Sequence, residues 1–258
     1  MRSLVSAVIV GVLLILAGCQ SSSSPPPASQ IIDRAIAAHG GSVLDHATMT
    51  FTFRGTSFRL AHRRNGRFHY RRTLTDSLGR SVVEGLTNDG PYRVIDSDTT
   101  TLSPDGRTEV ETAVNSVAYF ARLPAPLDDP AVQPSYSGRD TIDGTPYHRV
   151  RVTFQQEDGG SDWEDVFLYW FQTDSSTMDY FAYAYGLGGD EDTGTRFRAA
   201  DNVRRRGGVR IADYDNYTAD TLSPNEMHRY PDLLAQDALT HVSRVVLDSV
   251  QVRPIPDS

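Results

Sequence analysis

Hydrophobic and polar residues alternate with two different periods along this chain, and the changes of period divide it into elements. After Ser29, apolar residues recur at helical spacing, which predicts a short helix with Ser29 as its N-cap and Gly40-Gly41 as its stop. From Met49 onward every second residue is apolar, as in a strand with one buried face. Helical spacing returns over Val110–Ala121 and ends at Leu123-Pro124.

The segment Arg64-Asn65-Gly66 predicts a hairpin whose register can be chosen from the sequence. A two-residue Asn-Gly turn would set Leu60 against Arg71 and would mix the two faces. A three-residue loop with Gly66 in the left-handed conformation keeps the faces separate. It places these side chains on one face: Phe58, Leu60, His62, Phe68 and Tyr70. We expect the second register.

Further turn-forming segments follow, with strand-like runs between most of them. They are Asn88-Asp89-Gly90, Asp96-Ser97-Asp98, Asp143-Gly144, Asp158-Gly159-Gly160, Asp174-Ser175-Ser176 and Gly186 to Gly194. A final helical turn or two over Pro231–Thr240 precedes one alternating strand through Val245, Leu247, Ser249 and Gln251. We find neither a second linker nor a repeat of roughly 20 to 50 residues. Residues 30–258 are therefore expected to form a single, mainly β domain, an antiparallel meander with few helices.

Two strands depart from the alternation. Trp163–Phe171 and Met178–Tyr185 carry bulky apolar groups on both faces, so both faces must be covered. With so few helices, one face can pack on a helix, for which we favour Val110–Ala121, while the other lines a concavity. This predicts a curved sheet that forms a half-open barrel around a helical plug.

The N-terminus predicts export and a lipid anchor. One basic residue, Arg2, is followed by an apolar run and then by small residues that lead to Cys19, the only cysteine of the chain. This pattern predicts that residues 1–18 are a signal peptide, and the apolar run is too short for a stop-transfer helix. The pattern resembles bacterial lipoprotein signals, which implies cleavage before Cys19 and its acylation, with palmitate as the expected chain type. Residues 19–29 then form a Ser- and Pro-rich tether that reaches about 30 Å. By the same resemblance, Gln20 in place of Asp implies the outer membrane.

Composition narrows the classes of function. The chain contains no Lys, so Schiff-base and P-loop chemistry are excluded. Loss of Arg2 with the signal takes the net charge from −8 to −9, which disfavours nucleic acid as a partner. The absence of Lys and the abundance of Asp are typical of a protein from a salt-adapted source, but a high genomic GC content explains the absence of Lys equally well.

Several segments carry a family resemblance. They are Val114 to Pro124, Asp162 to Trp170, Asp179 to Tyr183 and Arg196-Phe197-Arg198. They resemble an uncharacterised family of Bacteroidota-type outer-membrane lipoproteins, and the resemblance covers most of the chain after Ser29. The architecture is similar to that of the periplasmic lipoprotein carrier and its outer-membrane receptor, a LolA/LolB-like half-barrel that holds acyl chains. The resemblance supplies no catalytic residues.

Candidate sites for chemistry are few. The seven histidines show no close ligand spacing. A group of carboxylates on a Gly-rich turn is a weak Ca²⁺ candidate against the simpler interpretation of a solvated turn: Asp158, Asp162, Glu164 and Asp165. There is no GxSxG elbow, and no cofactor is indicated. Arg196 and Arg198 share a strand face and are candidates to bind a headgroup or carboxylate, the alternative being ion pairs with neighbouring Asp.

Aromatic residues carry most of the information about a ligand. Most should be core, but those on a concave sheet would form the apolar wall of a cavity. The candidates are Phe51, Phe53, Phe58, Tyr70, Trp170, Tyr183 and Phe197. We therefore expect a noncatalytic, lipid-anchored envelope protein that binds or carries an amphiphile. Two alternatives stay open: an envelope hydrolase or metal-dependent enzyme, and an acidic scaffold that holds a partner. The sequence does not indicate an oligomeric state.

Overall fold

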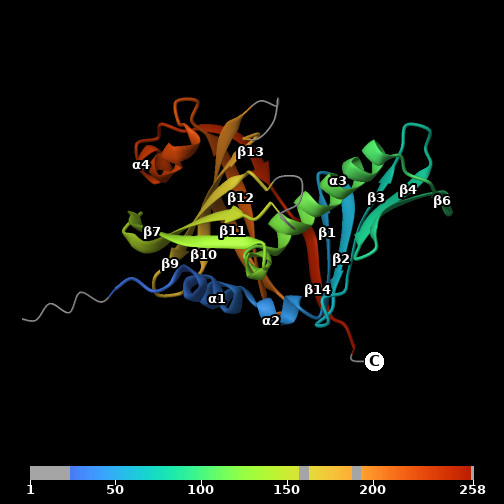
Figure 1. The fold of residues 1–258 in the computed structure, drawn as a ribbon, viewed down its shortest axis with the longest axis horizontal. Coiled ribbons are helices and arrows are strands. Elements are labelled where there is room, and N and C mark those ends of the chain that lie inside the picture. Colours follow the sequence, from blue (N-terminus) through green and yellow to red (C-terminus); the bar gives the residue numbers. More distant parts are fainter. Residues whose placement is uncertain (1–23, 157–162, 188–192, 257–258) are drawn as a thin grey trace, which may run out of the picture.

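Two antiparallel sheets enclose a long helix in the computed structural model, which describes residues 24–156, 163–187 and 193–256 (Figure 1). The first sheet, called sheet A, has the order β14-β1-β2-β3-β4-β5-β6, and sheet B has the order β13-β12-β11-β10-β9-β8-β7. The sheets are not joined into a closed barrel. The expected half-open, mainly β architecture is confirmed.

Sheet A is built mainly from the first third of the chain. Its strands are β1 (Ala47–Phe53), β2 (Thr56–His62), β3 (Phe68–Thr75), β4 (Ser81–Thr87), β5 (Gly90–Ile95), β6 (Asp98–Thr100) and β14 (Asp248–Pro254). Strands β2 and β3 pair His62 with Phe68, around a loop in which Gly66 has a φ of 74°. The register predicted with Gly66 as the left-handed residue is thus confirmed.

Sheet B contains the longer strands. They are β7 (Val132–Ile142), β8 (Thr145–Phe154), β9 (Val166–Gln172), β10 (Met178–Tyr185), β11 (Gly194–Arg206), β12 (Val209–Thr218) and β13 (Thr240–Val245). The single final strand expected through Val245–Gln251 is wrong. The chain leaves β13 at Val245 and enters β14 at Asp248, so it crosses from one sheet to the other.

The helices pack against the faces of the two sheets. They are α1 (Ala28–His39), α2 (Gly41–Leu44), α3 (Pro104–Arg122), η1 (Ala125–Asp128), η2 (Pro224–Arg229) and α4 (Tyr230–Ala235). Helix α1 begins at Ala28, after Pro27, without a side-chain cap, so Ser29 lies within the helix and is not the N-cap that the sequence predicted. Gly40 ends α1 in the left-handed conformation, as predicted.

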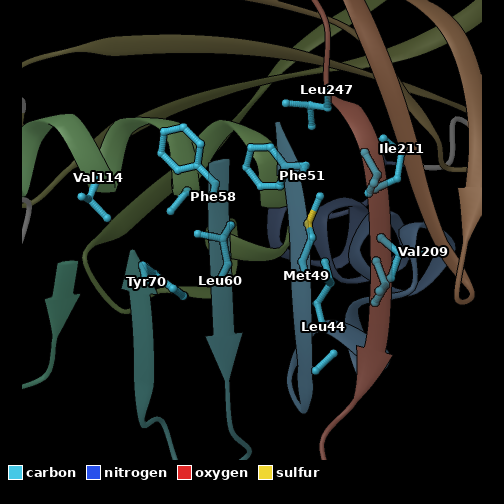
Figure 2. Packing of buried hydrophobic residues seen from close by; sticks show 14 of the residues in the cluster. Leu44, Met49, Phe51, Phe58, Leu60, Tyr70, Val114, Val209, Ile211 and Leu247 are labelled. Atoms are coloured by element: carbon cyan, nitrogen blue, oxygen red, sulfur yellow. The ribbon is translucent and has the colours of Figure 1, made fainter. Parts of the chain in front are cut away.

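Helix α3 is the plug that the sequence predicted. Its buried residues Val110, Val114 and Ala118 pack on the inner face of sheet A, against the side chains in Figure 2. In that view Phe51 and Phe58 lie side by side on neighbouring strands, and their rings stack with centroids 5.4 Å apart. Ser103 caps the helix by accepting a hydrogen bond from the Gly106 backbone N–H.

Strands β9 and β10 are covered on both faces, as predicted, but not by the expected helix on its own. On the inner face, Phe167, Tyr169 and Phe171 pack with α1, η1 and the end of α3. The outer face is covered by η2, α4 and the residues around them. Its largest side chain, Trp170, is fully buried there. The Pro231–Thr240 segment, and not Val110–Ala121, therefore contributes the helix on that face.

Candidate functional site

A cavity of about 240 Å³ lies between the two sheets, beside α3. Its lining comes from α1, β1, α3, β11, β12 and the crossing between β13 and β14. The lining residues are His39, Phe53, Arg54, Ser116, Val117, Phe120, Ala121, Leu123, Arg198, Arg210, Ile211, Ala212, Tyr214, Asn216, Val245 and Leu247. Engineered apolar cavities of about 150 Å³ hold one benzene molecule, so this space accommodates part of an alkyl chain.

The apolar wall of the cavity comes mainly from two facing elements. On α3, the residues Val117, Phe120 and Ala121 lie within about one helical turn and face the cavity together. On β12, the alternate residues Ala212 and Tyr214 face them. A strand and a helix with apolar faces toward each other form a slot that is open to a hydrocarbon chain.

Arg198 is the polar group that stands out in this slot. Its guanidinium lies 4.4 Å from the centre of the Phe120 ring and also stacks near Phe181 and Tyr183. One terminal nitrogen, Nη2, donates to the Tyr183 hydroxyl at 3.2 Å. Its Nε is buried and has no hydrogen-bond partner among the described residues. No acidic side chain of the described part of the chain pairs with it.

Asn216 lies directly across from Arg198. The two residues are register partners on β11 and β12, so their side chains lie on the same face of the sheet. The Asn216 amide nitrogen donates to the Ser243 hydroxyl at 3.2 Å. Its amide oxygen is buried and lacks a partner among the described residues. The cavity thus contains two neighbouring polar side chains whose hydrogen-bonding capacity the described protein does not fill.

The other buried polar residues of the cavity are already engaged. Arg210 forms an ion pair with Asp179 and donates to the Met178 carbonyl oxygen at 3.1 Å. His39 contacts the Ala35 carbonyl oxygen through Nδ1 at 2.8 Å. Burial, together with the nearby positive charges of Arg210 and Arg205, lowers the pKa of His39 to about 4, so its imidazole is neutral at pH 7. The Nε2 atom of His39 lies 3.4 Å from both the Met178 backbone nitrogen and Arg210 Nη1, and these contacts connect α1 to sheet B.

The cavity is positive although the protein is acidic. The chain has 33 acidic and 25 basic residues, but no Asp or Glu is among the cavity-lining residues. Three Arg side chains do line it: Arg54, Arg198 and Arg210. Arg54 is exposed, with its guanidinium 5.2 Å from the centre of the Phe53 ring. The arrangement favours a ligand with a negative charge over one with a positive charge.

The structure brings only some of the predicted cavity residues together. Phe53 lines the cavity, and Tyr183 adjoins it through its hydrogen bond to Arg198. Phe51, Phe58 and Tyr70 belong to the packed core between sheet A and α3 and do not line the cavity. The Tyr70 hydroxyl accepts a hydrogen bond from Arg122.

Trp170 and Phe197 are corrections to the predicted cavity. Both are fully buried on the outer face of sheet B, where Phe197 stacks on Tyr230 with ring centroids 5.1 Å apart. The Trp170 indole N–H donates to Asp140 at 2.7 Å. Periodicity showed that both faces of these strands are covered, but it could not say which face meets the cavity.

Of the two predicted headgroup residues, only Arg198 lines the cavity. Arg196 shares its strand face but donates to the Thr195 carbonyl oxygen at 2.8 Å and lies over the Tyr185 ring. No Asp neighbour is ion-paired with either Arg among the described residues, so the alternative of local ion pairs is not seen there.

The weak Ca²⁺ candidates fall partly outside the described residues. Asp158 and Asp162 lie outside them, as does Cys19, while Glu164 is exposed and Asp165 is half-buried. Within the described ranges, no three His, Cys, Asp or Glu side chains are grouped so that they could hold a metal ion.

Sequence reasoning missed the residues of β12 and α3 that complete the cavity. Tyr214 and Asn216 alternate with Asp213 and Asp215, which is the pattern of an ordinary half-buried strand. Asn216 could have been singled out, because it continues the buried row of Ala212 and Tyr214 with a polar residue. On α3, Val117 belongs to the helical spacing that predicts the plug, and neither it nor Phe120 was predicted to line a cavity.

No helix of the described chain combines the length and the apolar character needed to cross a bilayer.

Comparisons with known proteins agree with this architecture. A family model described as a family of unknown function (DUF6503) matches residues 8–246. No curated protein sequence matches the chain. The crystal structure of a LolA superfamily protein from Nitrosomonas europaea is similar, with a TM-score of 0.51 and 11% identity, covering 90% of this chain and 96% of that chain.

Two further solved structures have lower similarity. A DUF1329 family protein from Desulfovibrio piger has a TM-score of 0.41 and 10% identity, covering 88% of this chain and 93% of that chain. A putative outer membrane lipoprotein-sorting protein domain from Vibrio parahaemolyticus has a TM-score of 0.42 and 8% identity, covering 72% of this chain and 84% of that chain. The similarity to the Nitrosomonas protein shows the fold alone: two curved antiparallel sheets with a LolA-like arrangement.

Proposed function

We propose that this chain, which belongs to the DUF6503 family, is a lipid-anchored envelope protein that binds or carries an amphiphile in the cavity between its two sheets, without catalysing a reaction. The observation that carries the proposal is the slot between α3 and β12. It has apolar walls, a volume of about 240 Å³ and, at Arg198 and Asn216, polar atoms without partners among the described residues.

The envelope address rests on the N-terminal sequence. Residues 1–18 have the pattern of a lipoprotein signal that ends before Cys19, and a Ser- and Pro-rich tether follows. We extend this to the proposal that acylated Cys19 holds the protein at the outer membrane.

Apolar transfer sets the affinity expected for the alkyl chain. Each methylene removed from water contributes about 0.8 kcal/mol, which lowers Kd roughly fourfold. The Kd of a homologous series of alcohols should therefore fall about fourfold per carbon and level off when the slot is full. A binding site on an open surface would give a weaker dependence without that limit.

The test blocks the slot from α3. Ser116 lines the cavity, whereas its neighbour Asn115 is exposed and does not line it. We expect Ser116→Trp to weaken binding of dodecanol at least tenfold, measured by displacement of the uncharged probe N-phenyl-1-naphthylamine. Asn115→Trp is the matched control and should bind as the wild type does.

Two results would count against this function. One is the absence of probe and dodecanol binding by the wild type at concentrations below dodecanol's solubility limit. The other is equal dodecanol affinity in Ser116→Trp and Asn115→Trp, provided that both variants show the wild-type melting temperature.

A further inference from the structure

We infer that the cavity selects amphiphiles with an anionic headgroup, a carboxylate or a phosphate, and that Arg198 is the residue that binds the negative charge. The inference rests on the proposed function and deepens it, because an alkyl slot alone would accept neutral, anionic and cationic amphiphiles alike.

Arg198 differs from most half-buried or buried arginines of the described chain. Several half-buried or buried Arg side chains have a carboxylate partner within salt-bridge distance. They are Arg72 and Arg93 with Glu84, Arg149 with Asp140, Arg204 with Asp213, and Arg210 with Asp179. A guanidinium removed from water needs such compensation, because desolvation of an unpaired charge is costly. Arg198 has none among the described residues. Half-buried Arg122 and Arg196 also lack a carboxylate partner among the described residues, but of these three arginines only Arg198 lines the cavity.

The contacts that Arg198 does make leave hydrogen-bonding capacity for a ligand. Its flat face rests on Phe120, and cation–π attraction replaces part of the lost hydration. Tyr183 accepts one hydrogen bond from Nη2. No bond to Nε or Nη1 is made within the described residues. A carboxylate or phosphate oxygen that reaches Nη1 would form a charge-assisted hydrogen bond.

Arg198 lies inside a slot whose other walls are mainly apolar, so it can bind a headgroup while the slot holds the alkyl chain. Its cross-strand partner Asn216 adds a second polar side chain there, while Phe120 and Tyr214 border the hydrocarbon path. Such a pairing of polar and apolar walls matches one molecule that has both a charged head and an alkyl tail.

The surrounding charges disfavour the opposite ligand. No acidic residue lines the cavity, and Arg54 adds positive charge to that of Arg198, whereas the charge of Arg210 is paired with Asp179. A cationic headgroup would meet repulsion without a carboxylate to pair with. His39 adds no positive charge at neutral pH, since its imidazole is neutral.

The experiment compares four amphiphiles with the same twelve-carbon chain: dodecanoate, dodecyl phosphate, dodecanol and dodecyltrimethylammonium. Each displaces N-phenyl-1-naphthylamine at pH 8, below the micellar concentration of the amphiphile. The protein is the full chain with the Cys19→Ser change, which carries no acyl chain, and it is called the wild type here with respect to the cavity. We expect the wild type to bind at least one of the two anions at least tenfold more tightly than the alcohol, and the cation more weakly than the alcohol. The ratio of dodecanoate to dodecyl phosphate then identifies the source of the charge, a fatty acid or a phosphorylated lipid.

Variants assign the selectivity to a residue. Arg198→Gln should lose at least tenfold in affinity for the preferred anion while dodecanol binds as before, and Arg198→Lys should keep part of the preference. Arg196→Gln, on the same strand face but outside the cavity, is the matched control and should keep all of it.

Three outcomes separate the two proposals. If dodecanol and both anions bind the wild type equally, the headgroup inference is wrong while the proposed function stands. If Arg196→Gln loses as much selectivity as Arg198→Gln, the charge is not held by Arg198. If none of the four molecules binds, the proposed function itself fails. The wild-type comparison needs no variant, so it decides even if Arg198→Gln does not fold.

Discussion

At the scale of single residues, burial decides which side chains of the cavity carry charge. His39 is only 3% exposed, and its pKa is lowered from 6.5 to about 4, chiefly by desolvation. It therefore stays neutral over the range in which an exposed imidazole becomes protonated. Its Nδ1 contacts the Ala35 carbonyl oxygen within α1, and its Nε2 lies 3.4 Å from both the Met178 backbone nitrogen and Arg210.

This lowered pKa predicts a pH dependence of stability. Between pH 6.5 and about 4 the unfolded chain binds a proton at His39 that the folded protein does not, so stability is lost as the pH falls through this window and levels off below it. A difference of that size is worth about 3 kcal/mol. We expect urea unfolding at pH 7 and pH 4.5 to show a smaller loss of stability in His39→Gln than in the wild type. Equal losses in the two proteins would contradict the assignment.

Phe197 allows the two faces of sheet B to be tested separately. Because its ring is fully buried against Tyr230 on the outer face, Phe197→Ala should lower the free energy of unfolding by about 3–5 kcal/mol and leave the affinity for dodecanol unchanged. Phe53→Ala should do the reverse, with weaker binding and a smaller loss of stability, because Phe53 is half-buried and lines the cavity. Urea denaturation and probe displacement on both variants measure this. If fully folded Phe197→Ala bound dodecanol more weakly than the wild type, the ligand would lie on the outer face of sheet B, which contradicts the proposed cavity.

At the scale of elements, Gly40 at the end of α1 allows a close contact with the start of β12, the strand that lines the cavity. Gly40 has a φ of 88°, and a Cβ placed there would lie 2.7 Å from the Gly208 carbonyl oxygen. The close approach sets α1 against the start of β12, the strand that carries Ala212, Tyr214 and Asn216. The contact between Gly40 and Gly208 therefore fixes the end of α1 relative to the cavity wall that β12 forms.

A matched pair of glycine substitutions tests this contact. Gly55 also has a positive φ, of 80°, but a Cβ there would meet nothing within 4 Å. Gly55→Ala should cost about 1–2 kcal/mol, from the left-handed conformation alone. Gly40→Ala should cost clearly more, because backbone must also move. Chemical denaturation of both variants gives the comparison, and equal losses would show that the contact with Gly208 has no energetic role.

Elements whose limits are set by local chemistry could be predicted from the sequence. The hairpin register followed from Gly66, and the plug helix followed from the helical spacing of Val110, Val114 and Ala118. The hairpin register and the helix are both determined by residues that are close together in the sequence. The crossing between β13 and β14 could not be predicted, because alternation of apolar residues continues through it although the chain changes sheets.

The candidate site was harder to predict for the same physical reason. Phe53 and Arg198 were predicted and line the cavity, whereas Trp170 and Phe197 were predicted and lie on the opposite face. Apolar spacing gives the same pattern for a face covered by α4 and for a face that meets a cavity. Only the three-dimensional arrangement of α3 and η2 distinguishes the two.

At the scale of the whole molecule, the acidic composition and the proposed N-terminal lipid together predict how the protein attaches to the membrane. The net charge is negative, so the surface as a whole provides no attraction to anionic lipid. Under the proposed function, attachment therefore comes from acylated Cys19.

Removal of the acylation site tests the anchor. Cys19→Ser should release the protein from the membrane fraction and leave its melting temperature and its affinity for dodecanol unchanged, since the chain has no second cysteine with which to form an internal disulfide. Fractionation after a salt and carbonate wash, with immunodetection, measures the release. Retention of Cys19→Ser in the membrane pellet would mean that another surface holds the protein there.

The central claim is that an alkyl chain lies between α3 and β12, and cross-linking tests it most directly. A dodecanoate with a diazirine at its terminal carbon is bound, irradiated and located by peptide mass spectrometry, with excess dodecanoate as competitor. We predict competed cross-links chiefly on Pro104–Arg122 and Val209–Thr218, the elements that form the slot, with any others on the remaining residues that line the cavity. Competed cross-links on α4 and the outer face around Trp170, or none that dodecanoate displaces, would contradict it.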